Sequence, residues 1–330
     1  MARRPARGPA PVVQWAQEHG EVGGVLASHA QLTAQLRAAG HPVTYVDTGS
    51  PRRALGALPR AVRRRGLHLL HITRLWRAMV LAPVFALLPG RTALVLHSGS
   101  VAGQLERMSH RQRRVLRTAL RAYDEIWPVN DEIALAFEDG PGRPVRVITP
   151  FSADATSPAH ASAGDGQVRE PHLLSVATNA GLAHYNADLA VRAAELVRES
   201  WPDAALRVLA YGHAGPELAE LRAAVAGLPW VELSFDASPS EVHDVLLRSA
   251  VFLRPTAWDG DSVIVREALA AGARVVATDT APRPVGVELA SPDAADLARA
   301  VVEGGRPSDG GGLTSLTAFD AAVDALGRLS

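Results

Sequence analysis

The 330-residue sequence contains no cysteine and no lysine, and only 5% of its residues are aromatic. Without cysteine, neither disulfides nor thiolate metal sites can form. Without lysine, a cationic side chain that contacts a phosphate must be arginine or histidine. All 34 residues counted as lysine or arginine are therefore arginines.

Long hydrophobic runs are also missing. No apolar stretch reaches the roughly 18–20 residues needed to cross a bilayer, and the nearest, 79–90, is interrupted by Pro83. Residues 1–11 carry arginines with no apolar core after them, so we do not expect a secretory signal. These features predict a cytoplasmic protein.

A globular composition is present, with an uneven distribution of charge. The chain is 47% hydrophobic and 21% charged, and its formal net charge is zero. Residues 1–150 hold 21 arginines against 10 acidic residues, a net of +11, whereas residues 151–330 hold 13 against 24, a net of −11. This asymmetry predicts two domains with different partners.

Short apolar runs alternate with helical patterns in both halves, which is typical of parallel sheets covered by helices on both faces. Strands are expected at 11–16, 42–48, 67–72, 92–97, 125–129 and 145–149, and again at 172–178, 205–212, 231–235, 250–255 and 273–279. The pattern predicts an α/β fold with two doubly wound, Rossmann-like domains. We assign 1–150 to the first domain, 151–170 to a linker rich in Ser, Ala and Gly, 171–312 to the second domain, and 313–330 to a C-terminal helix that could cross back to the first.

Ligands of such sheets bind beyond the carboxyl ends of the strands. The candidate residues are therefore those that follow strands: Gly23 and Gly24, His97, Asn179, Gly212, and the segment 259–262. His97 alone could equally be a core histidine, and His71, at the end of another strand, is interpreted as structural.

The stretch "AWDGDSVIVREALAAGARVVATD" (257–279) places two acids, Asp259 and Glu267, around the start of an apolar helix. Ser262 is a good N-cap residue, and the unpaired amides that follow it would face a phosphate at the positive end of the helix dipole. Carboxylates on either side could accept hydrogen bonds from sugar hydroxyls.

Two other interpretations of this stretch remain open. In the first, Asp259 and Asp261 cap the helix while Glu267 pairs with Arg266 or another arginine. In the second, Asp259-Gly260-Asp261 is an Asp-x-Asp metal motif, although its place before a helix start explains the triplet without a metal.

Residues 259–287, "DGDSVIVREALAAGARVVATDTAPRPVGV", resemble the signature of the retaining nucleotide-sugar glycosyltransferases of GT-B fold (group 1, family 4 type). That signature is an acid, seven residues, a Glu, Ala-Leu, a small residue with Gly, and a strand ending in Ala-Thr-Asp. Segments 21–46, 95–99, 145–151 and 172–215 resemble the same family, so the likeness covers most of residues 12–305.

The resemblance implies two domains facing across a cleft, and transfer of a sugar with retention of configuration from a nucleoside-diphosphate sugar to a glycan, lipid-linked or small-molecule acceptor. It implies no cofactor and no metal. The implied donor-site residues are Glu267 on the ribose, Asp259 and His97 on the transferred sugar, the amides of Ser262 and Val263 on the distal phosphate, and Gly23 and Gly24 beside the diphosphate.

The sequence departs from the family pattern in two places. The first acid, usually Glu, is Asp259, and no Arg or Lys occurs between 170 and 191, where the family usually has both. His184, Arg254 or Arg283 could supply the missing charge. A noncatalytic GT-B-like binding or partner subunit, and a sugar-nucleotide isomerase on the same fold, therefore remain alternatives.

Two arginine-rich segments, 51–66 and 109–125, carry apolar residues at helical spacing. Such helices can lie on the anionic inner face of a membrane. They can equally be packed by their apolar side with the arginines in solvent. Nucleic-acid binding is not expected, because aromatic residues are scarce in both segments and no recognition motif occurs.

Overall fold

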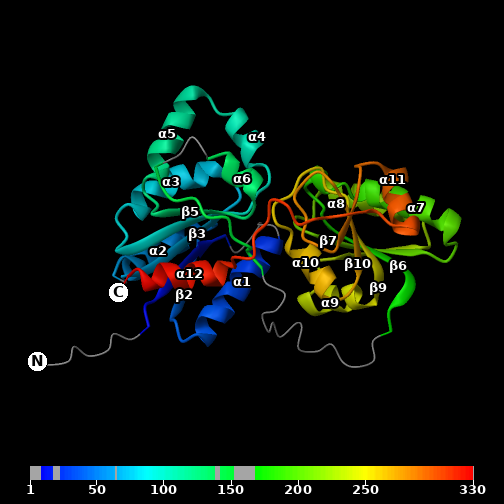
Figure 1. The fold of residues 1–330 in the computed structure, drawn as a ribbon, viewed down its shortest axis with the longest axis horizontal. Coiled ribbons are helices and arrows are strands. Elements are labelled where there is room, and N and C mark those ends of the chain that lie inside the picture. Colours follow the sequence, from blue (N-terminus) through cyan, green and yellow to red (C-terminus); the bar gives the residue numbers. More distant parts are fainter. Residues whose placement is uncertain (1–8, 18–22, 64, 138–141, 152–167, 330) are drawn as a thin grey trace, which may run out of the picture. The chain divides into compact units, whose positions relative to one another are not determined.

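The structure is a computed structural model, and it describes residues 9–17, 23–63, 65–137, 142–151 and 168–329. The chain divides into two compact units (Figure 1). Unit 1 comprises Met1–Glu21, Val25–Phe151 and Leu313–Ser330, and unit 2 comprises Val22–Gly24 and Ser152–Gly312. Of the predicted linker, residues 152–167 lie outside the described residues. No helix in the described part has the length and apolarity needed to cross a bilayer.

Unit 1 contains a five-stranded parallel sheet in the order β2-β1-β3-β4-β5. Its strands are β1 Val12–Ala16, β2 Val43–Asp47, β3 Gly66–Ile72, β4 Gly90–Leu96 and β5 Glu125–Pro128. Its helices are α1 Gly23–Ala38, α2 Pro51–Val62, α3 Leu75–Phe85, α4 Val101–Glu106, α5 His110–Leu120, α6 Asp131–Leu135 and α12 Ala318–Gly327.

Both faces of this sheet are buried, as a continuously apolar parallel strand requires. In β3, Leu67 and Leu69 face the cluster that contains α1 and α12, while Leu70 and Ile72 face the cluster that contains α2, α3 and α5. Figure 1 shows α12, in red, beside α1. The C-terminal helix is therefore part of the cover of unit 1.

The strand expected over 145–149 is present only as isolated bridges. Val145 bridges Ile126 of β5, and Thr149 bridges Thr317 at the start of α12. Pro144 and Pro150 flank the segment, and a proline cannot donate to a ladder. This short edge instead ties the C-terminal segment to unit 1, because Thr149 N donates to Leu316 O at 2.7 Å.

Unit 2 contains a seven-stranded sheet in the order β12-β11-β10-β9-β6-β7-β8, parallel except for the pair β11 and β12. Its strands are β6 Glu170–Asn179, β7 Ala205–Tyr211, β8 Val231–Phe235, β9 Ser249–Arg254, β10 Arg274–Thr278, β11 Val287–Ala290 and β12 Arg306–Pro307. Its helices are α7 Ala187–Ser200, α8 Pro216–Val225, α9 Pro239–Arg248, α10 Val263–Ala270 and α11 Ala294–Glu303, with a 3₁₀ turn at Ala183–Tyr185.

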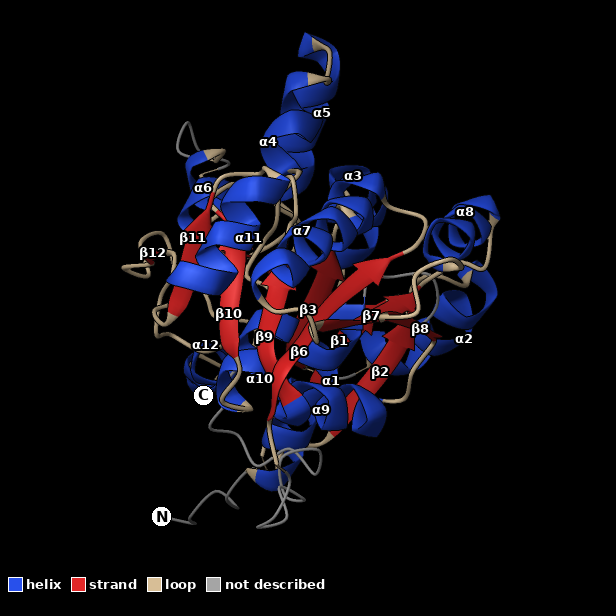
Figure 2. Ribbon diagram, turned by 90° about the vertical axis from the view of Figure 1, so that its right-hand side faces the viewer, coloured by secondary structure: helices blue, strands red, loops and turns tan. Residues whose placement is uncertain are grey.

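The helices of unit 2 cover both faces of its sheet (Figure 2). The core on one face contains α7 and α11, and the core on the other contains α9 and α10. The strand order reverses between β6 and β9, which is where an open α/β sheet leaves a crevice for a ligand. The carboxyl ends of β6 and β9 therefore define the candidate site.

Candidate functional site

The loops that follow β6 and β9 are bound to one another. Asn186 Nδ2 donates to Pro255 O at 2.9 Å, and Ala257 N donates to His184 O at 2.8 Å. The rings of His184 and Trp258 stack with their centroids 3.6 Å apart. These contacts hold the carboxyl end of β9 against the loop that follows β6. This is the loop in which the sequence lacks the two cations usual in the family.

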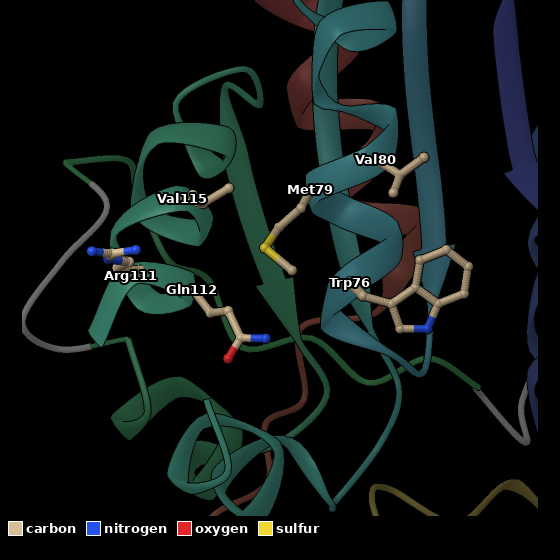
Figure 3. A pocket seen from close by; sticks show the side chains of 6 residues that line it. All are labelled: Trp76, Met79, Val80, Arg111, Gln112 and Val115. Atoms are coloured by element: carbon tan, nitrogen blue, oxygen red, sulfur yellow. The ribbon is translucent and has the colours of Figure 1, made fainter. Parts of the chain in front are cut away.

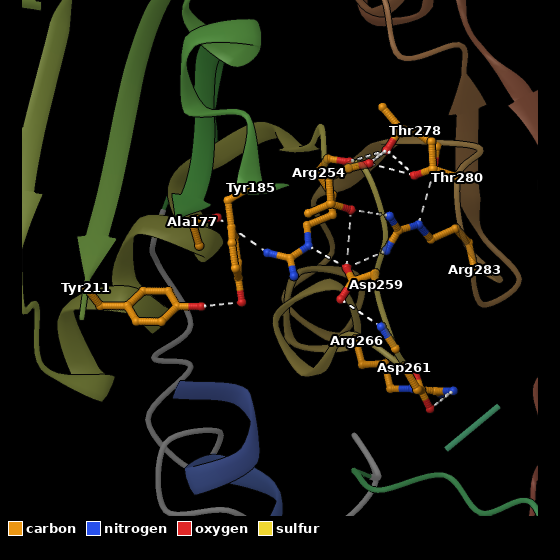
Figure 4. A network of polar contacts seen from close by, with 12 residues as sticks. Ala177, Tyr185, Tyr211, Arg254, Asp259, Asp261, Arg266, Thr278, Thr280 and Arg283 are labelled. Atoms are coloured by element: carbon orange, nitrogen blue, oxygen red, sulfur yellow. Dashed lines mark hydrogen bonds and ion pairs between the residues drawn. The ribbon is translucent and has the colours of Figure 1, made fainter. Parts of the chain in front are cut away.

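Asp259 lies between two buried arginines (Figure 4). Its Oδ2 accepts from Arg254 Nε and from Arg283 Nη1, both at 2.8 Å, while its Oδ1 accepts from Gly260 N at 3.0 Å. The arginines are only 4% and 2% exposed. Burial opposes ionisation of Asp259, but the two guanidinium groups outweigh it and hold its pKa well below the usual range.

This Arg254–Asp259–Arg283 network changes the interpretation of all three residues. Asp259 is the shared counter-ion of two buried guanidinium groups, and the sum of two positive charges and one negative charge is +1. Arg283 is fully engaged, since Nε donates to Thr278 O and Nη2 to Thr256 Oγ1. Arg254 lies 4.7 Å from the Tyr185 ring centroid, its Nε donates to Asp259 and its Nη1 donates to Ala177 O. A side-chain hydrogen bond from Arg254 also lowers the pKa of Tyr185, against the larger effect of burial. Of the two arginines expected to reach phosphates, Arg254 is the one whose Nη2 donates to no carboxylate, backbone or threonine oxygen of a described residue.

The start of α10 offers a second set of donors. Ser262 occupies the N-cap position but its side chain makes no capping hydrogen bond. Its Oγ is buried and has no partner among the described residues. Because the first three amides of the helix, beginning with that of Val263, have no intrahelical acceptor, this terminus can bind an anion.

The interpretation in which Asp259 and Asp261 cap the helix while Glu267 pairs with Arg266 or another arginine is wrong, because no described arginine pairs with Glu267 and no side chain caps the helix. Arg266 donates through Nε and Nη2 to the two oxygens of Asp261, at 2.7 and 2.9 Å. The two carboxylates of the Asp-x-Asp triplet are thus each paired with arginine. Burial nevertheless raises the pKa of Asp261, despite the attraction of Arg266.

Glu267, in the second turn of α10, has no hydrogen-bond or ion-pair partner within the described part of the chain. Burial raises the pKa of its carboxyl from 4.5 to about 7. A partly buried acid without a partner and with a perturbed pKa is typical of ligand-binding sites.

Asn179 ends β6, Gly212 directly follows the neighbouring strand β7, and the two residues lie in close contact. Gly212 has φ +102°, and a Cβ there would lie 2.6 Å from Asn179 Oδ1. Asn179 Oδ1 accepts from Gly181 N at 3.1 Å, so the glycine is required by the packing of that turn. His184, in the same crevice, does not supply the expected positive charge. Burial lowers its pKa to about 4, with a smaller lowering by Arg254, and the charge of Asp259 opposes this only in part.

In unit 1 a histidine pair occupies the carboxyl ends of β3 and β4. His71 Nδ1 lies 3.0 Å from His97 Nε2, and the His29 ring from α1 lies 6.1 Å from that of His71. Burial, and then the charge of His29, lowers the pKa of His97 to about 3. Burial also lowers that of His71. Interpreting His71 as purely structural missed this pair, although residues 67, 69, 71 and 93, 95, 97 share one face of adjacent strands.

Residues 170–304 match the family described as "Glycosyl transferases group 1". They form a group 1 glycosyl transferase domain. A comparison with curated proteins finds no match.

Solved structures show that the chain has the GT-B fold. It is similar to the pneumococcal O-GlcNAc transferase GtfA in complex with UDP and GlcNAc (14% identity, TM-score 0.57, 84% of this chain and 56% of that one). It is also similar to Anabaena Alr3699/HepE in complex with UDP and glucose (13%, 0.63, 88% and 88%). A third is an α,α-trehalose-phosphate synthase from Burkholderia xenovorans (12%, 0.64, 97% and 96%). The chain thus spans little more than half of GtfA.

Outside the glycosyl transferase domain, the other expected site residues are only partly described. Gly23 and Gly24 begin α1, but residues 18–22, which hold the rest of the predicted loop, lie outside the described residues. In α2, Ala57, Leu58 and Ala61 pack on the core, and in α5 Leu116 and Leu120 do so. Packing therefore accounts for these apolar residues of the two arginine-rich segments, whereas Val115 of α5 is 57% exposed.

Proposed function

We propose that the protein transfers a glycosyl group from a UDP-sugar to an acceptor hydroxyl. The observation that carries the proposal is the donor set at the start of α10: the Ser262 hydroxyl and the first-turn amides have no partner within the described chain, and the unpaired Glu267 lies one turn further on. The neighbours GtfA and HepE, whose structures hold UDP with a sugar, support uracil as the base.

In this proposal the diphosphate lies against the start of α10. The amides of Val263 and the next residues, the Ser262 hydroxyl and Arg254 Nη2 donate to its oxygens. The net charge of +1 in the Arg254–Asp259–Arg283 network replaces the cations that the loop after β6 lacks. Charge-assisted hydrogen bonds of this kind contribute about 1.5–3 kcal/mol each.

Glu267 accepts hydrogen bonds from the ribose hydroxyls. Its carboxyl is paired with no described arginine, so an ionised Glu267 can turn both oxygens to the ligand. Its pKa is raised because burial removes water from the carboxylate. Hydrogen bonds from the ribose hydroxyls would replace that lost hydration.

We further propose that the reaction retains the configuration of the sugar. The bond from the anomeric carbon to the β-phosphate oxygen breaks as the acceptor oxygen attacks the same face, and the departing phosphate takes the acceptor proton. This route needs no protein nucleophile. Arg254 and the α10 amides stabilise the charge that develops on the leaving group, in the role a metal ion plays elsewhere. His97, which is uncharged at neutral pH, hydrogen-bonds the transferred sugar.

The acceptor, in this proposal, is a glycan, a lipid-linked sugar or a small molecule taken up by unit 1. The protein works in the cytoplasm, peripherally on the inner face of the membrane. One observation favours a second candidate, a noncatalytic donor-binding protein: Asp259 engages both arginines, so the site lacks a fully free cation.

The test is calorimetric titration with UDP and a panel of UDP-sugars, followed by an assay of UDP release. We expect Glu267→Gln to weaken UDP binding about 10- to 100-fold, as the loss of a charged hydrogen bond implies. Glu220→Gln, on the exposed side of α8, is the matched control and should bind as wild type does. No binding of any sugar nucleotide to the wild type would contradict the proposal. Binding without turnover across acceptors would favour the noncatalytic candidate.

A further inference from the structure

The outer surface of α3 and α5 in unit 1 is apolar and open. Trp76, Val80 and Val115 are 49%, 63% and 57% exposed, and they are three of the ten large apolar side chains that the described chain exposes. With Met79, Arg111 and Gln112 they line a shallow hollow, which we call the α3–α5 surface. Figure 3 shows Met79 between the two helices, with Trp76 and Val80 along α3 and the other three residues along α5.

Packing within unit 1 does not account for this surface. The core side of α3 already buries Leu75, Ala78, Ala82 and Phe85. Tyr123 OH also donates to Ala78 O on that side, at 2.9 Å. The opposite side of α3 repeats the apolar character, and Arg77 is the only charged residue of the helix. A surface helix is normally polar on that side, so the exposed apolar residues indicate a partner.

The charge around the surface has one sign. Residues 48–123 contain fifteen arginines and a single acid, Glu106. Neither α3 nor α5 contains an acidic residue. The arginines of α5 are exposed and form no ion pair with a described residue, unlike Arg91, Arg146 and Arg328 of the same unit, which converge on Glu125. The unpaired set is Arg111, Arg113, Arg114 and Arg117.

The partner must therefore offer anionic groups and an apolar layer together. Nucleic acid supplies phosphates but no apolar layer for Val80 and Val115. A phospholipid surface supplies both, because the phosphates lie above the acyl chains. Tryptophan is enriched at that boundary, and arginines bind the headgroups.

We propose that the α3–α5 surface docks on the anionic face of a phospholipid bilayer, with Trp76, Val80 and Val115 at the boundary between headgroups and acyl chains and the arginines of α5 on the lipid phosphates. The role of this docking rests on the proposed function: it would bring the enzyme to an acceptor at the membrane. Its evidence is independent of the donor site, since every residue involved belongs to unit 1.

Flotation with vesicles of phosphatidylglycerol and phosphatidylcholine at low salt tests whether the arginines of α5 bind the lipid phosphates. Binding of the wild type is expected, with little binding to phosphatidylcholine alone or at high salt. The variant Arg111→Gln, Arg114→Gln, Arg117→Gln should partition about 100-fold less, from about fivefold per arginine. The matched control, Arg52→Gln, Arg63→Gln, Arg65→Gln, removes the same charge from exposed positions elsewhere in unit 1 and should lose less than tenfold. Equal losses in both variants would overturn the proposal.

Quenching of tryptophan emission by brominated acyl chains tests the apolar part. We expect quenching in the wild type, its loss in Trp76→Phe, and its retention in Trp258→Phe, which removes a half-exposed tryptophan from unit 2. Quenching that survives Trp76→Phe would overturn the assignment of the surface. Sedimentation velocity that shows a dimer abolished by Val80→Ser would assign the surface to a second copy instead.

The same preparations separate this proposal from the donor site. Calorimetry with UDP reports on unit 2 alone. Retained UDP binding without flotation would overturn the docking proposal and leave the proposed transferase function standing. Flotation without binding of any sugar nucleotide would overturn the proposed function and leave the docking proposal standing.

Discussion

The two units contain similar doubly wound sheets, but the residues at the carboxyl ends of their strands differ in charge. Unit 1 places His71 and His97 there, and burial keeps both uncharged near neutral pH. Unit 2 places a charged network there, in which Asp259 neutralises one of two buried arginines. The difference suggests a division of labour, since uncharged hydrogen-bonding groups suit sugar hydroxyls and a cationic network suits a diphosphate.

The units also differ in where their unpaired charge lies. In unit 1 the arginines of α5 are exposed and unpaired with described residues, while the buried Glu125 is surrounded by three arginines. In unit 2 Arg254 and Arg283 are buried. A buried charge must be paired to be tolerated, whereas an exposed one is free to meet a partner. Four changes test this contrast.

The largest effect is expected from Asp259→Asn. It leaves two buried guanidinium groups without a counter-ion, so the free energy of unfolding of unit 2 should fall by about 3–5 kcal/mol. Urea unfolding followed by circular dichroism measures the change. Asp188→Asn, which removes an exposed pair with Arg192, should change it by less than about 1 kcal/mol. A loss of that small size in Asp259→Asn would mean that the arginines do not depend on Asp259.

Arg254→Gln should weaken UDP binding about 10- to 100-fold, because it removes the guanidinium group that we propose to donate to the diphosphate. Binding of uridine, which has no phosphate, should change far less, and calorimetry with both ligands measures the difference. Arg248→Gln, at the distant end of α9, is the control. A similar loss for uridine and UDP would place Arg254 outside the phosphate site.

Glu267 predicts a pH dependence of UDP binding. Its pKa of about 7 in the free protein means that the carboxylate, the better acceptor, forms only as the pH rises through 7. Affinity for UDP should therefore fall about tenfold from pH 8 to pH 6, after subtraction of the profile of Glu267→Gln, which corrects for titration of the phosphate. Superimposable profiles would remove Glu267 from the ribose site.

The smallest effect concerns His97. Its folded-state pKa of about 3 lies below the unfolded value of 6.5, so its contribution to stability is present above pH 6.5 and is lost as the pH falls toward 3. Between pH 7 and 5.5 the loss should be about 1 kcal/mol for this residue. Urea unfolding of His97→Gln should show a flatter pH profile than wild type by that amount, while His110→Gln, at an exposed position, should not.

Much of the fold could be predicted from the sequence because parallel strands buried on both faces are continuous apolar runs. Ten of the eleven expected strands occur, and the segment 145–149 reaches only isolated bridges between two prolines. β11 and β12 were missed because they have four and two residues, too few for a periodic signal.

The site was harder to predict, since its partners are distant in the chain. The motif located Asp259, Ser262 and Glu267 on one loop and helix, but Arg283 reaches Asp259 from 24 residues away. A sequence motif does not encode that contact. In the same way, the apolar run at 79–90 does not show from its composition alone that Val80 faces solvent.

The bridge between Thr149 and Thr317 joins the end of the chain to unit 1, so unit 1 can be completed only late in synthesis. Unit 2 is an insertion within unit 1, because α12 returns to cover Leu67 and Leu69 beside α1. During synthesis, therefore, the first sheet is left with one face partly bare until the whole glycosyl transferase domain has been made. A nascent chain that stalls before residue 318 would present that bare face to chaperones and proteases.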